Sequence, residues 1–314
     1  MNKTVRPKVK RRKKDIGTVK VHCVSETLSP LTHMMETAGN ESIINREKVI
    51  HNGMEKWIPV LSGNSIRHKL IRDSGMHYLL NACSMRKKID IKQANFLFYG
   101  GGLTESSNSE KMKEIAEMYE LFPLVRLLGA SLPWQIVAGS LIVFRGKLIC
   151  EENKHFIYEL LPEKFDIDLN CQLKSSEDFI HAYQYTRGDI TRHKDVVEIV
   201  SQDELASDKK TGLMIYNGQC IITGSLFYHG FILNRISRKE VGAFFLSLET
   251  WQESGAFLGG YSRIGHGKLK LNVMIEDSKD FISASDIDDC IDEYINHVEV
   301  NKAKCIEWLD KNFK

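Results

Sequence analysis

The order of apolar and polar segments most constrains what this chain can fold into. Alternating residues predict a strand at 17–24, and a short apolar strand at 57–61 runs directly into a helix that begins at 62. Nearer the C-terminus the pattern predicts a strand at 219–233, a helix at 237–251 and a strand at 268–275. Strands and helices separated by long insertions are typical of an α+β core, so we expect an α+β fold decorated by insertions.

The inserted segments differ in character. Residues 25–56 are polar and lack periodicity, which predicts a long functional loop. Residues 88–132 have helical character, 134–152 are apolar and β-prone, and 183–218 are polar with no clear core face. Residues 286–313 predict a final acidic helix. The helix at 237–251 should begin with a capping box, because Ser237 is followed by Glu240.

Charge is distributed unevenly along the chain. The 43 Lys and Arg residues against 41 Asp and Glu residues give a net charge of +2, which argues against nucleic-acid binding by bulk charge alone. The first fourteen residues, however, hold eight Lys and Arg residues and no acid, whereas 276–314 has eleven acids and five bases. A basic run at an N-terminus is usually a solvated arm and often contacts nucleic acid. We therefore expect residues 1–14 to form a basic N-terminal arm.

Cysteine and histidine spacing does not match a disulfide framework or a metal site. The seven cysteines are scattered and odd in number without a C-x-x-C pair, and the eleven histidines show no H-E-x-x-H spacing. We therefore expect reduced thiols, no metal and a cytoplasmic protein. The sequence also lacks a secretory signal and any run of the roughly 18 apolar residues that a membrane span needs, so no membrane partner is expected.

Residues 62–72 (SGNSIRHKLIR) combine a helix start with several cations. Free backbone N–H groups and the helix dipole make a helix N-terminus a binding site for anions. The candidate phosphate ligands in this segment are Asn64, Ser65, Arg67, Lys69 and Arg72. An ordinary capped helix with a basic, solvated face explains the segment equally well.

Residues 259–270 (GGYSRIGHGKLK) form a glycine-rich segment ahead of a strand. Glycine lets the backbone approach a ligand closely or adopt a positive φ. Ser262, Arg263, His266 and Lys268 would supply hydrogen-bond donors. The segment contains neither G-K-[ST] nor G-x-G-x-x-G, so no nucleotide cofactor is expected. A simple glycine-rich turn is the alternative.

A third segment suits single-stranded nucleic acid, on which cations follow phosphates and flat side chains stack on bases. It contains Arg187 and Arg192, with Met214 and Tyr216 beyond them. A charged surface hairpin is the more economical explanation of this segment alone.

The polar segment 25–56 contributes His33, Met34 and Arg46 as further candidates. Met34 and its neighbour Met35 have no evident core to fill in a polar loop, so they are candidates for contact with a ligand or a neighbouring subunit.

Taken in order, these motifs resemble the CRISPR effector-backbone family, the repeat-associated subunits that polymerise along a guide RNA. The family pattern includes a "P-G-S-S-L-R/K-G" helix start and a terminal "G-G-x-x-S-R-G-Y-G" loop. The corresponding segments here are Ser62-Gly63-Asn64-Ser65-Ile66-Arg67 and the glycine-rich segment 259–267. The resemblance spans nearly the whole chain after residue 15. PLTHMMETAGNE (30–41) and VLSGNSIRHKLIR (60–72) are most similar to the type IV branch.

The resemblance implies an RRM-like (ferredoxin-like) palm over residues 15–314. Residues 82–133 would be a helical finger insertion and 187–217 a thumb hairpin that displaces guide bases at regular intervals. The candidates in the helix start and in the glycine-rich segment would then line one groove along the guide phosphates, with Met214 and Tyr216 near the thumb tip.

The resemblance also implies function and partners. The chain would be a non-catalytic backbone subunit of a type IV effector that presents CRISPR RNA for pairing with target nucleic acid. Its partners would be CRISPR RNA, further copies of itself, other effector subunits at the two ends, complementary target DNA or possibly RNA, and a helicase.

The sequence departs from the type III branch, whose members cut target RNA with an aspartate in the long loop. No aspartate lies between Asp15 and Asp73, and Glu36 is the only substitute that we consider. We therefore expect no cleavage by this subunit.

Three alternatives remain open: a metal-dependent target-RNA nuclease, a CRISPR-RNA processing endoribonuclease with His33 as general acid or base, and an unrelated RNA-binding protein that acts as a monomer. His68, where relatives often have glycine, puts the closeness of the RNA backbone to this turn in doubt.

Overall fold

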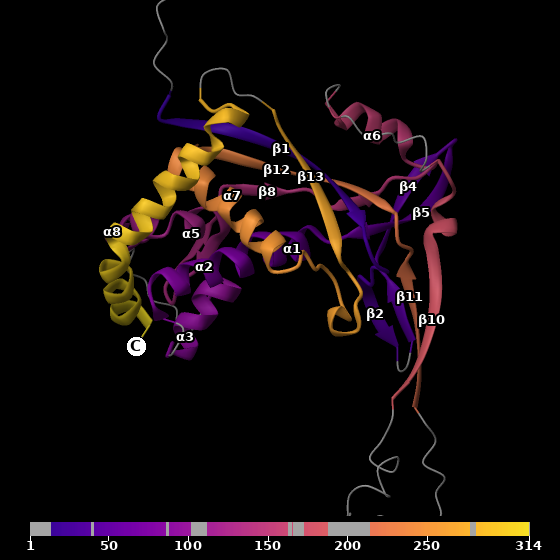
Figure 1. Ribbon diagram of the computed structural model, residues 1–314, viewed down its shortest axis with the longest axis horizontal. Coiled ribbons are helices and arrows are strands. Elements are labelled where there is room, and N and C mark those ends of the chain that lie inside the picture. Colours follow the sequence, from indigo (N-terminus) through magenta and orange to yellow (C-terminus); the bar gives the residue numbers. More distant parts are fainter. Residues whose placement is uncertain are drawn as a thin grey trace, which may run out of the picture.

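A computed structural model describes residues 14–38, 41–85, 88–101, 112–162, 165, 173–187, 214–276 and 281–313. Its central strands are antiparallel, and β1 (Ile16–Thr27) lies between β12 (Leu226–Ser237) and β13 (Leu269–Glu276) (Figure 1). Beyond β12 the sheet continues through β9 (Gly146–Leu148) to β5 (Met54–Leu61) and β4 (Arg46–His51). The short strand β8 (Leu141–Val143) pairs with another part of β12.

The order β13-β1-β12-β9 is that of a ferredoxin-like sheet, in which two strand-helix-strand units interlock. The first unit runs from β1 through the helix after β5 to β8 and β9, and the second runs from β12 through α7 (Arg238–Glu253) to β13. The predicted α+β, RRM-like fold is therefore confirmed.

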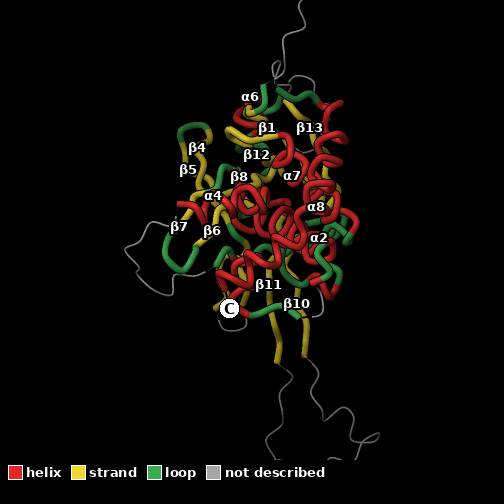
Figure 2. Tube along the Cα trace, turned by 90° about the vertical axis from the view of Figure 1, so that its left-hand side faces the viewer, coloured by secondary structure: helices red, strands yellow, loops and turns green. Residues whose placement is uncertain are grey.

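Most of the helices gather on one face of this sheet (Figures 1 and 2). One continuous helical run comprises α1 (Gly63–Ile66), the π-helix η1 (Arg67–Asp73) and α2 (Ser74–Ala82). It packs against α7, which in turn packs against the long C-terminal helix α8 (Ile287–Phe313). Phe231 of β12 meets Phe244 of α7 edge to face, with ring centroids 5.0 Å apart. A Cβ at Gly242 of α7 would overlap the carbonyl of Cys290, so glycine sets how closely α7 approaches α8.

The opposite face carries a smaller apolar cluster beneath α6 (Lys154–Leu160). Val24, Ile149, Ile157, Leu226 and Tyr228 are buried there. Val24 and Tyr228 are cross-strand partners in β1 and β12, and the strand period of two points their side chains away from the main helical layer. The central strands are thus buried on both faces at this end of the sheet.

A second sheet has the order β10-β11-β3-β2, with β2 (Met34–Ala38), β3 (Glu41–Ile44), β10 (Ile180–Arg187) and β11 (Met214–Ile221). β10 and β11 form an antiparallel pair that runs away from the body of the molecule (Figures 1 and 2).

The prediction of a loop over 25–56 was wrong, because β2, β3, β4 and part of β5 lie in this segment. Ile44 and Val49 are buried only once the segment packs against the body, so periodicity alone did not reveal these strands. Asn52 and Gly53 join β4 to β5 with φ of 51° and 73°, and Asn-Gly is a strong local signal for such a hairpin.

Two further segments needed correction. The single strand predicted at 219–233 is the end of β11, a turn at Gly224 with φ of 85°, and most of β12. The polar segment 183–218 begins and ends in β10 and β11, whereas 188–213, which includes most of the expected thumb, lies outside the described residues. The strands expected at 17–24, 57–61 and 268–275 are confirmed, as are the C-terminal helix and the Ser237–Glu240 capping box.

The segment 88–132 is mainly helical where it is described, and 134–152 contains only short strands. The elements not yet named are α3 (Ile91–Ala94), η3 (Asn95–Tyr99), α4 (Met112–Leu121), α5 (Pro123–Leu128), β6 (Gly129–Ser131), β7 (Ile136–Ala138), η5 (Ser176–Phe179), η7 (Ser262–Ile264) and η8 (Ala284–Asp286).

The division into palm, fingers and thumb stays a prediction, and the basic arm lies outside the described residues except for Lys14. Across the described part of the chain, no helix is both long and apolar enough to cross a membrane.

The buried His229 on β12 predicts a loss of stability in mild acid. Burial lowers its pKa from 6.5 to about 4, while its Nε2 lies 2.8 Å from Ser25 Oγ. The unfolded chain takes up a proton near pH 6.5 and the folded chain does not, so stability falls as the pH drops from 6.5 toward 4. We expect this group to contribute about 1.4 kcal/mol of lost unfolding free energy per pH unit in that window.

Urea unfolding between pH 7 and pH 5 measures this slope. His229→Gln should make the pH dependence shallower, whereas His155→Gln, on an exposed side chain of α6, should leave it unchanged. Equal slopes in both variants would contradict the assignment to His229.

Candidate nucleic-acid interface

The helical run after β5 begins with unused backbone donors. The Ser62 N–H donates to Nε2 of His33 over 2.9 Å, but the Ser62 side chain makes no capping hydrogen bond. The N–H groups of a first helical turn have no partner within the helix. Within the described part of the chain the Ser62 side chain therefore leaves these groups uncapped, and they can bind an anion.

A surface hollow of about 320 Å³ lies at this helix start. We call it the helix-start hollow; its lining residues are Ser62, Gly63, Asn64, Arg67, Leu141, Val143 and Arg145. The Nε of Arg67 is buried and has no hydrogen-bond partner, and burial lowers the pKa of its guanidinium. Arg145 forms an ion pair of 3.4 Å with Glu47. Two guanidinium groups beside free N–H groups fit a phosphate.

Arg145 was missed in the sequence, although the R-G-K tripeptide at 145–147 was a possible signal. It reaches the hollow because β8 and β9 lie beside the helix start. A Cβ at Gly63 would lie 3.2 Å from the Val143 carbonyl oxygen, which shows how closely the two elements approach. Asn64 is exposed and Ser65 is half-buried at the same turn.

Arg72 lies in the interior of the protein and not on the surface, where a phosphate ligand was expected. Its side chain is buried, and it donates to the carbonyl oxygens of Leu97 over 3.2 Å and Gly129 over 2.9 Å. Burial, with a smaller effect from Arg67, lowers its pKa to about 10. Carbonyls at helix ends attract cations, and Arg72 thus joins the ends of η3 and α5 to η1. This buried position disfavours the predicted phosphate-binding role of Arg72.

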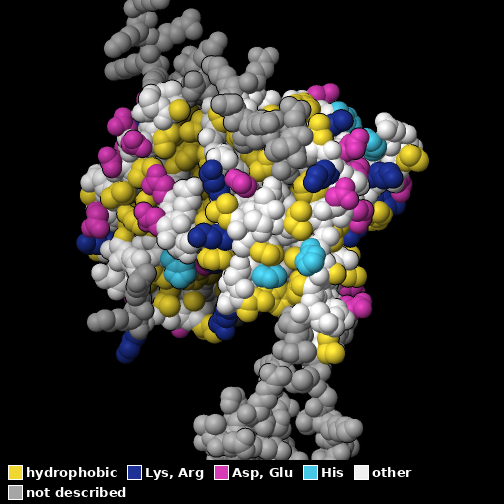
Figure 3. Space-filling model, turned by 45° about the vertical axis from the view of Figure 1, so that its right-hand side comes forward, with side chains coloured by type: hydrophobic (Ala, Val, Ile, Leu, Met, Phe, Trp, Pro, Cys, Tyr) yellow, Lys and Arg dark blue, Asp and Glu magenta, His cyan; other side chains and the backbone are white. Residues whose placement is uncertain are grey.

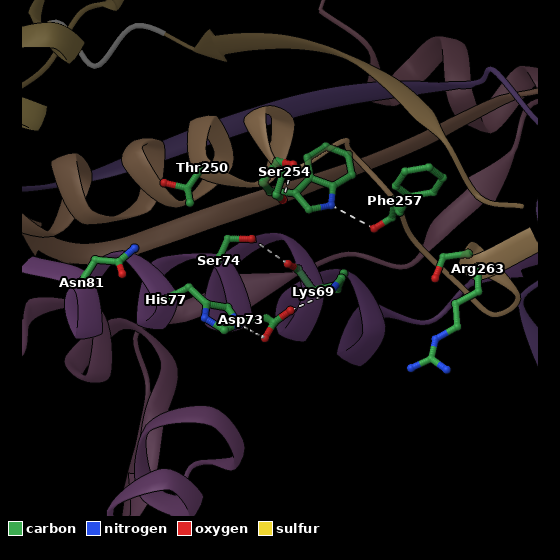
Figure 4. A pocket seen from close by; sticks show the side chains of 11 residues that line it. Lys69, Asp73, Ser74, His77, Asn81, Thr250, Ser254, Phe257 and Arg263 are labelled. Atoms are coloured by element: carbon green, nitrogen blue, oxygen red, sulfur yellow. Dashed lines mark hydrogen bonds and ion pairs between the residues drawn. The ribbon is translucent and has the colours of Figure 1, made fainter. Parts of the chain in front are cut away.

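A second hollow, of about 500 Å³, lies between the first helical run and the end of α7 (Figure 4). We call it the interhelical pocket; it is lined by Lys69, Asp73, Ser74, His77, Asn81, Thr250, Trp251, Ser254, Phe257, Ser262 and Arg263. Lys69 comes from the helix-start motif, whereas Ser262 and Arg263 come from the glycine-rich motif. Segments that are almost two hundred residues apart in the sequence thus line the same pocket.

The charges in the interhelical pocket are partly compensated. Asp73 forms an ion pair of 2.6 Å with Lys69 and lies 3.5 Å from Nε2 of His77. No residue in the described part of the chain pairs with the guanidinium of Arg263, which is exposed. An incoming anion would therefore meet a free cation at Arg263 and a shared one at Lys69.

The glycine-rich segment is fastened to residues 30–33. The Gly267 N–H donates to the Pro30 carbonyl over 2.7 Å, and the Gly260 N–H donates to the Thr32 carbonyl over 2.8 Å. Thr32 Oγ1 also lies 2.8 Å from Nδ1 of His266, and burial lowers the pKa of this histidine. A Cβ at Gly259, whose φ is 90°, would overlap the Thr32 carbonyl, so the close contact requires glycine.

An aromatic cluster joins this segment to the second sheet. The rings of Tyr183, Tyr261 and His266 meet edge to face, with centroids 5.4 to 6.1 Å apart. Tyr183 lies over Gly218, where a Cβ would overlap its ring. Figure 3 shows histidine and hydrophobic side chains above the place where β10 and β11 leave the body, with acidic side chains mainly toward the flanks. Tyr183 and Tyr261 were missed, because nothing in their spacing indicates that they meet.

His33 and Met34 lie at the centre of this region. His33 is buried, its Nε2 accepts the Ser62 N–H, and burial lowers its pKa. Met34 is exposed at the start of β2, and a Cβ at Gly260 would touch its Cε at 3.4 Å. His33 therefore positions the helix start, while Met34 offers an apolar surface beside the glycine-rich segment.

The structure describes the side chains of some of the remaining candidates and only the backbone of others. Arg46 on β4 forms an ion pair of 2.8 Å with Glu177, and it lines neither hollow. Lys268 is exposed, and its backbone N–H donates to Ser29 Oγ over 2.9 Å. Tyr216 is half-buried on β11. The backbones of Arg187 and Met214 pair across β10 and β11, and Arg192 lies outside the described residues.

His68 stacks on the exposed ring of Tyr99, with centroids 5.8 Å apart and an angle of 22°. Its exposed ring thus packs against Tyr99 instead of leaving the open turn that a glycine would. Within the described ranges, no three His, Cys, Asp or Glu side chains are grouped so that they could hold a metal ion.

Neither a protein-family model nor a curated protein matches this sequence. Among solved structures, the chain is similar to a chain of a structure titled "Type IV-B CRISPR Complex", with a TM-score of 0.57 and 15% sequence identity. The match covers 86% of this chain and 97% of that chain. At this identity the likeness shows the fold.

The position of Arg72 predicts that its removal damages stability. Arg72→Met leaves two buried carbonyls without their donor, so we expect the free energy of unfolding to fall by about 2–4 kcal/mol. Lys69→Met, at a side chain that is 47% exposed, should cost less than about 1 kcal/mol, because its ion pair faces solvent. Urea unfolding of the two variants measures the difference, and equal losses would contradict a structural role for Arg72.

Proposed function

We propose that this chain is a non-catalytic backbone subunit of a type IV CRISPR effector, which polymerises along CRISPR RNA and presents the guide for target pairing. The observation that carries the proposal is that two hollows with cationic lining residues lie along one helical run, and that the glycine-rich segment lines one of them. The fold shared with a chain of a type IV-B CRISPR complex supports the same assignment.

The chemistry of the interface supports binding to an RNA backbone. Arg67, Arg145 and the free N–H groups at the helix start offer a phosphate site, and Arg263 offers a second cation across the helical run. Tyr183, Tyr261 and Met34 supply flat or apolar surfaces on which bases can lie. None of these contacts selects a base, so sequence would be read by pairing of the guide, as in other RNA-guided effectors.

The proposal includes a multimer with defined partners. Further copies of this chain would follow one another along the guide, other effector subunits would close the two ends, and complementary target DNA or possibly RNA would pair with exposed bases. A helicase would act with the complex in defence against plasmids or other foreign DNA in the cytoplasm. The basic arm and the acidic C-terminal segment supply opposite charges for contacts with RNA or between neighbours.

The positions of the two catalytic candidates favour a non-catalytic subunit. Glu36 is exposed on β2, where the nuclease alternative would require several metal ligands around it. His33 is buried, and the lone pair of its Nε2 already accepts the Ser62 N–H. A general base needs a free lone pair within reach of the reacting proton, so the geometry disfavours His33 in the processing alternative.

Removing one cation from the helix-start hollow should weaken RNA binding in a salt-dependent way. Arg67→Ala removes one phosphate contact, so the slope of log affinity against log salt should become shallower by about 0.7. Lys304→Ala makes the same charge change on an exposed residue of α8 and should leave the slope unchanged. Fluorescence anisotropy with single-stranded RNA measures both slopes, and an unaltered slope for Arg67→Ala would count against this hollow.

Co-expression with a CRISPR array tests the multimer directly. We expect electron microscopy to show a regular assembly whose length follows that of the guide, because each copy covers a fixed length of RNA. RNA-bound monomers would favour the generic RNA-binding alternative. Site-specific cutting of repeat RNA, or Mg²⁺-dependent cutting of complementary RNA that Glu36→Ala abolishes, would overturn the non-catalytic assignment.

A further inference from the structure

Three hydroxyl groups that line the interhelical pocket donate their hydrogens away from it. Ser74 Oγ donates to the Lys69 carbonyl over 3.1 Å, and Thr250 Oγ1 donates to the Leu246 carbonyl over 2.8 Å. Ser254 Oγ donates to the Trp251 carbonyl over 2.9 Å. Each hydrogen therefore points to its own helix, and the oxygen presents lone pairs to a ligand. Both walls of the pocket carry such acceptors, because Ser74 lies on α2, Thr250 on α7 and Ser254 at its end.

The other polar groups divide the pocket into two chemical zones. The indole N–H of Trp251 is used by the Phe257 carbonyl over 3.0 Å, so it offers no donor to a ligand. The Asp73 carboxylate adds further acceptor oxygens along the first helical run. Arg263 and Ser262, by contrast, line the pocket from the glycine-rich segment, and Arg263 is free to bind an anion. A fitting ligand carries an anionic group for Arg263 and a hydrogen-bond donor for the hydroxyl oxygens.

We propose that the interhelical pocket reads the ribose 2′-hydroxyl of bound RNA through the acceptor oxygens of Ser74, Thr250 and Ser254. The inference rests on the proposed function and adds selection for RNA over DNA to it. The 2′-hydroxyl is a donor that every ribonucleotide carries whatever its base, and it lies on the sugar carbon next to the one that bears the 3′-phosphate. The pocket of about 500 Å³ has room for one nucleotide.

Because the three hydroxyl oxygens can only accept, the pocket would recognise the hydrogen of the 2′-hydroxyl. A 2′-fluoro group keeps an acceptor but has no hydrogen, so it would place its electrons against the lone pairs of the pocket. A 2′-deoxy sugar leaves the same acceptors without a partner in a partly enclosed site. A 2′-amino group retains a donor and should therefore bind as the hydroxyl does.

Short oligouridines of one length, differing only at the 2′ position, test this inference on the full chain. We expect the 2′-hydroxyl and 2′-amino oligomers to bind about 5- to 20-fold more tightly than the 2′-deoxy and 2′-fluoro oligomers, as for one hydrogen bond to a partly enclosed acceptor. The double variant Thr250→Val, Ser254→Ala should reduce this ratio to about two-fold or less by weakening only the two tighter ligands.

Thr250→Ser keeps the acceptor and should keep the discrimination, while Thr18→Val removes a hydroxyl on β1 that bonds Asn234 and should change nothing. Thermal unfolding of each variant confirms that it is folded. RNA binding that ignores the 2′ substituent, or discrimination that survives the double variant, would overturn the inference and leave the proposed function standing. Failure of wild-type protein to bind any of the oligomers would instead count against the proposed function itself.

Discussion

The hydrogen bonds made by residues 30–33 hold the segments of the candidate interface together. Pro30 and Thr32 accept N–H groups of the glycine-rich segment, and Leu31 exchanges bonds of 2.8 and 2.9 Å with Ile221 at the end of β11. His33 accepts the Ser62 N–H and, through its carbonyl, that of Asn45. Four consecutive residues thus fix the helix start, the second sheet and the glycine-rich segment relative to one another. Their backbone groups are buried and would be costly to leave unpaired, so the arrangement is closely specified.

The π-helix η1 distributes three neighbouring cations into three environments. Arg67 faces the helix-start hollow, Lys69 reaches the interhelical pocket, and Arg72 is buried beneath the carbonyls of η3 and α5. π-helical segments depart from the α-helical repeat and occur frequently at functional sites. Arg72, in the same segment, turns inward and donates to carbonyls of the neighbouring helical segments. Residues that line the two hollows and a residue that packs neighbouring helices together thus lie within one seven-residue segment.

The near-neutral net charge is compatible with an anion-binding surface because the compensation is local. Glu240 accepts from Arg126, Glu177 from Arg46 and Asp73 from Lys69, so these cations have carboxylate partners. Arg67 and Arg263 have none within the described part of the chain, and both line the hollows. The surface suits a polyanion because Arg67 and Arg263 lack carboxylate partners in the described residues and because the N–H groups of the helix start point outward. An excess of cations over the whole chain is not needed.

The α+β class, the principal strands and helices, and the two motifs whose cations line the interhelical pocket could be predicted from the sequence. These follow from local periodicity, caps and glycine positions, which depend on neighbouring residues. Only the tertiary structure revealed β2 to β4, the buried role of Arg72, the contribution of Arg145 and the Tyr183–Tyr261–His266 cluster. Each depends on contacts between residues distant in the chain: a strand with few apolar residues forms when a partner buries them, and a cation faces inward when remote carbonyls need its donors.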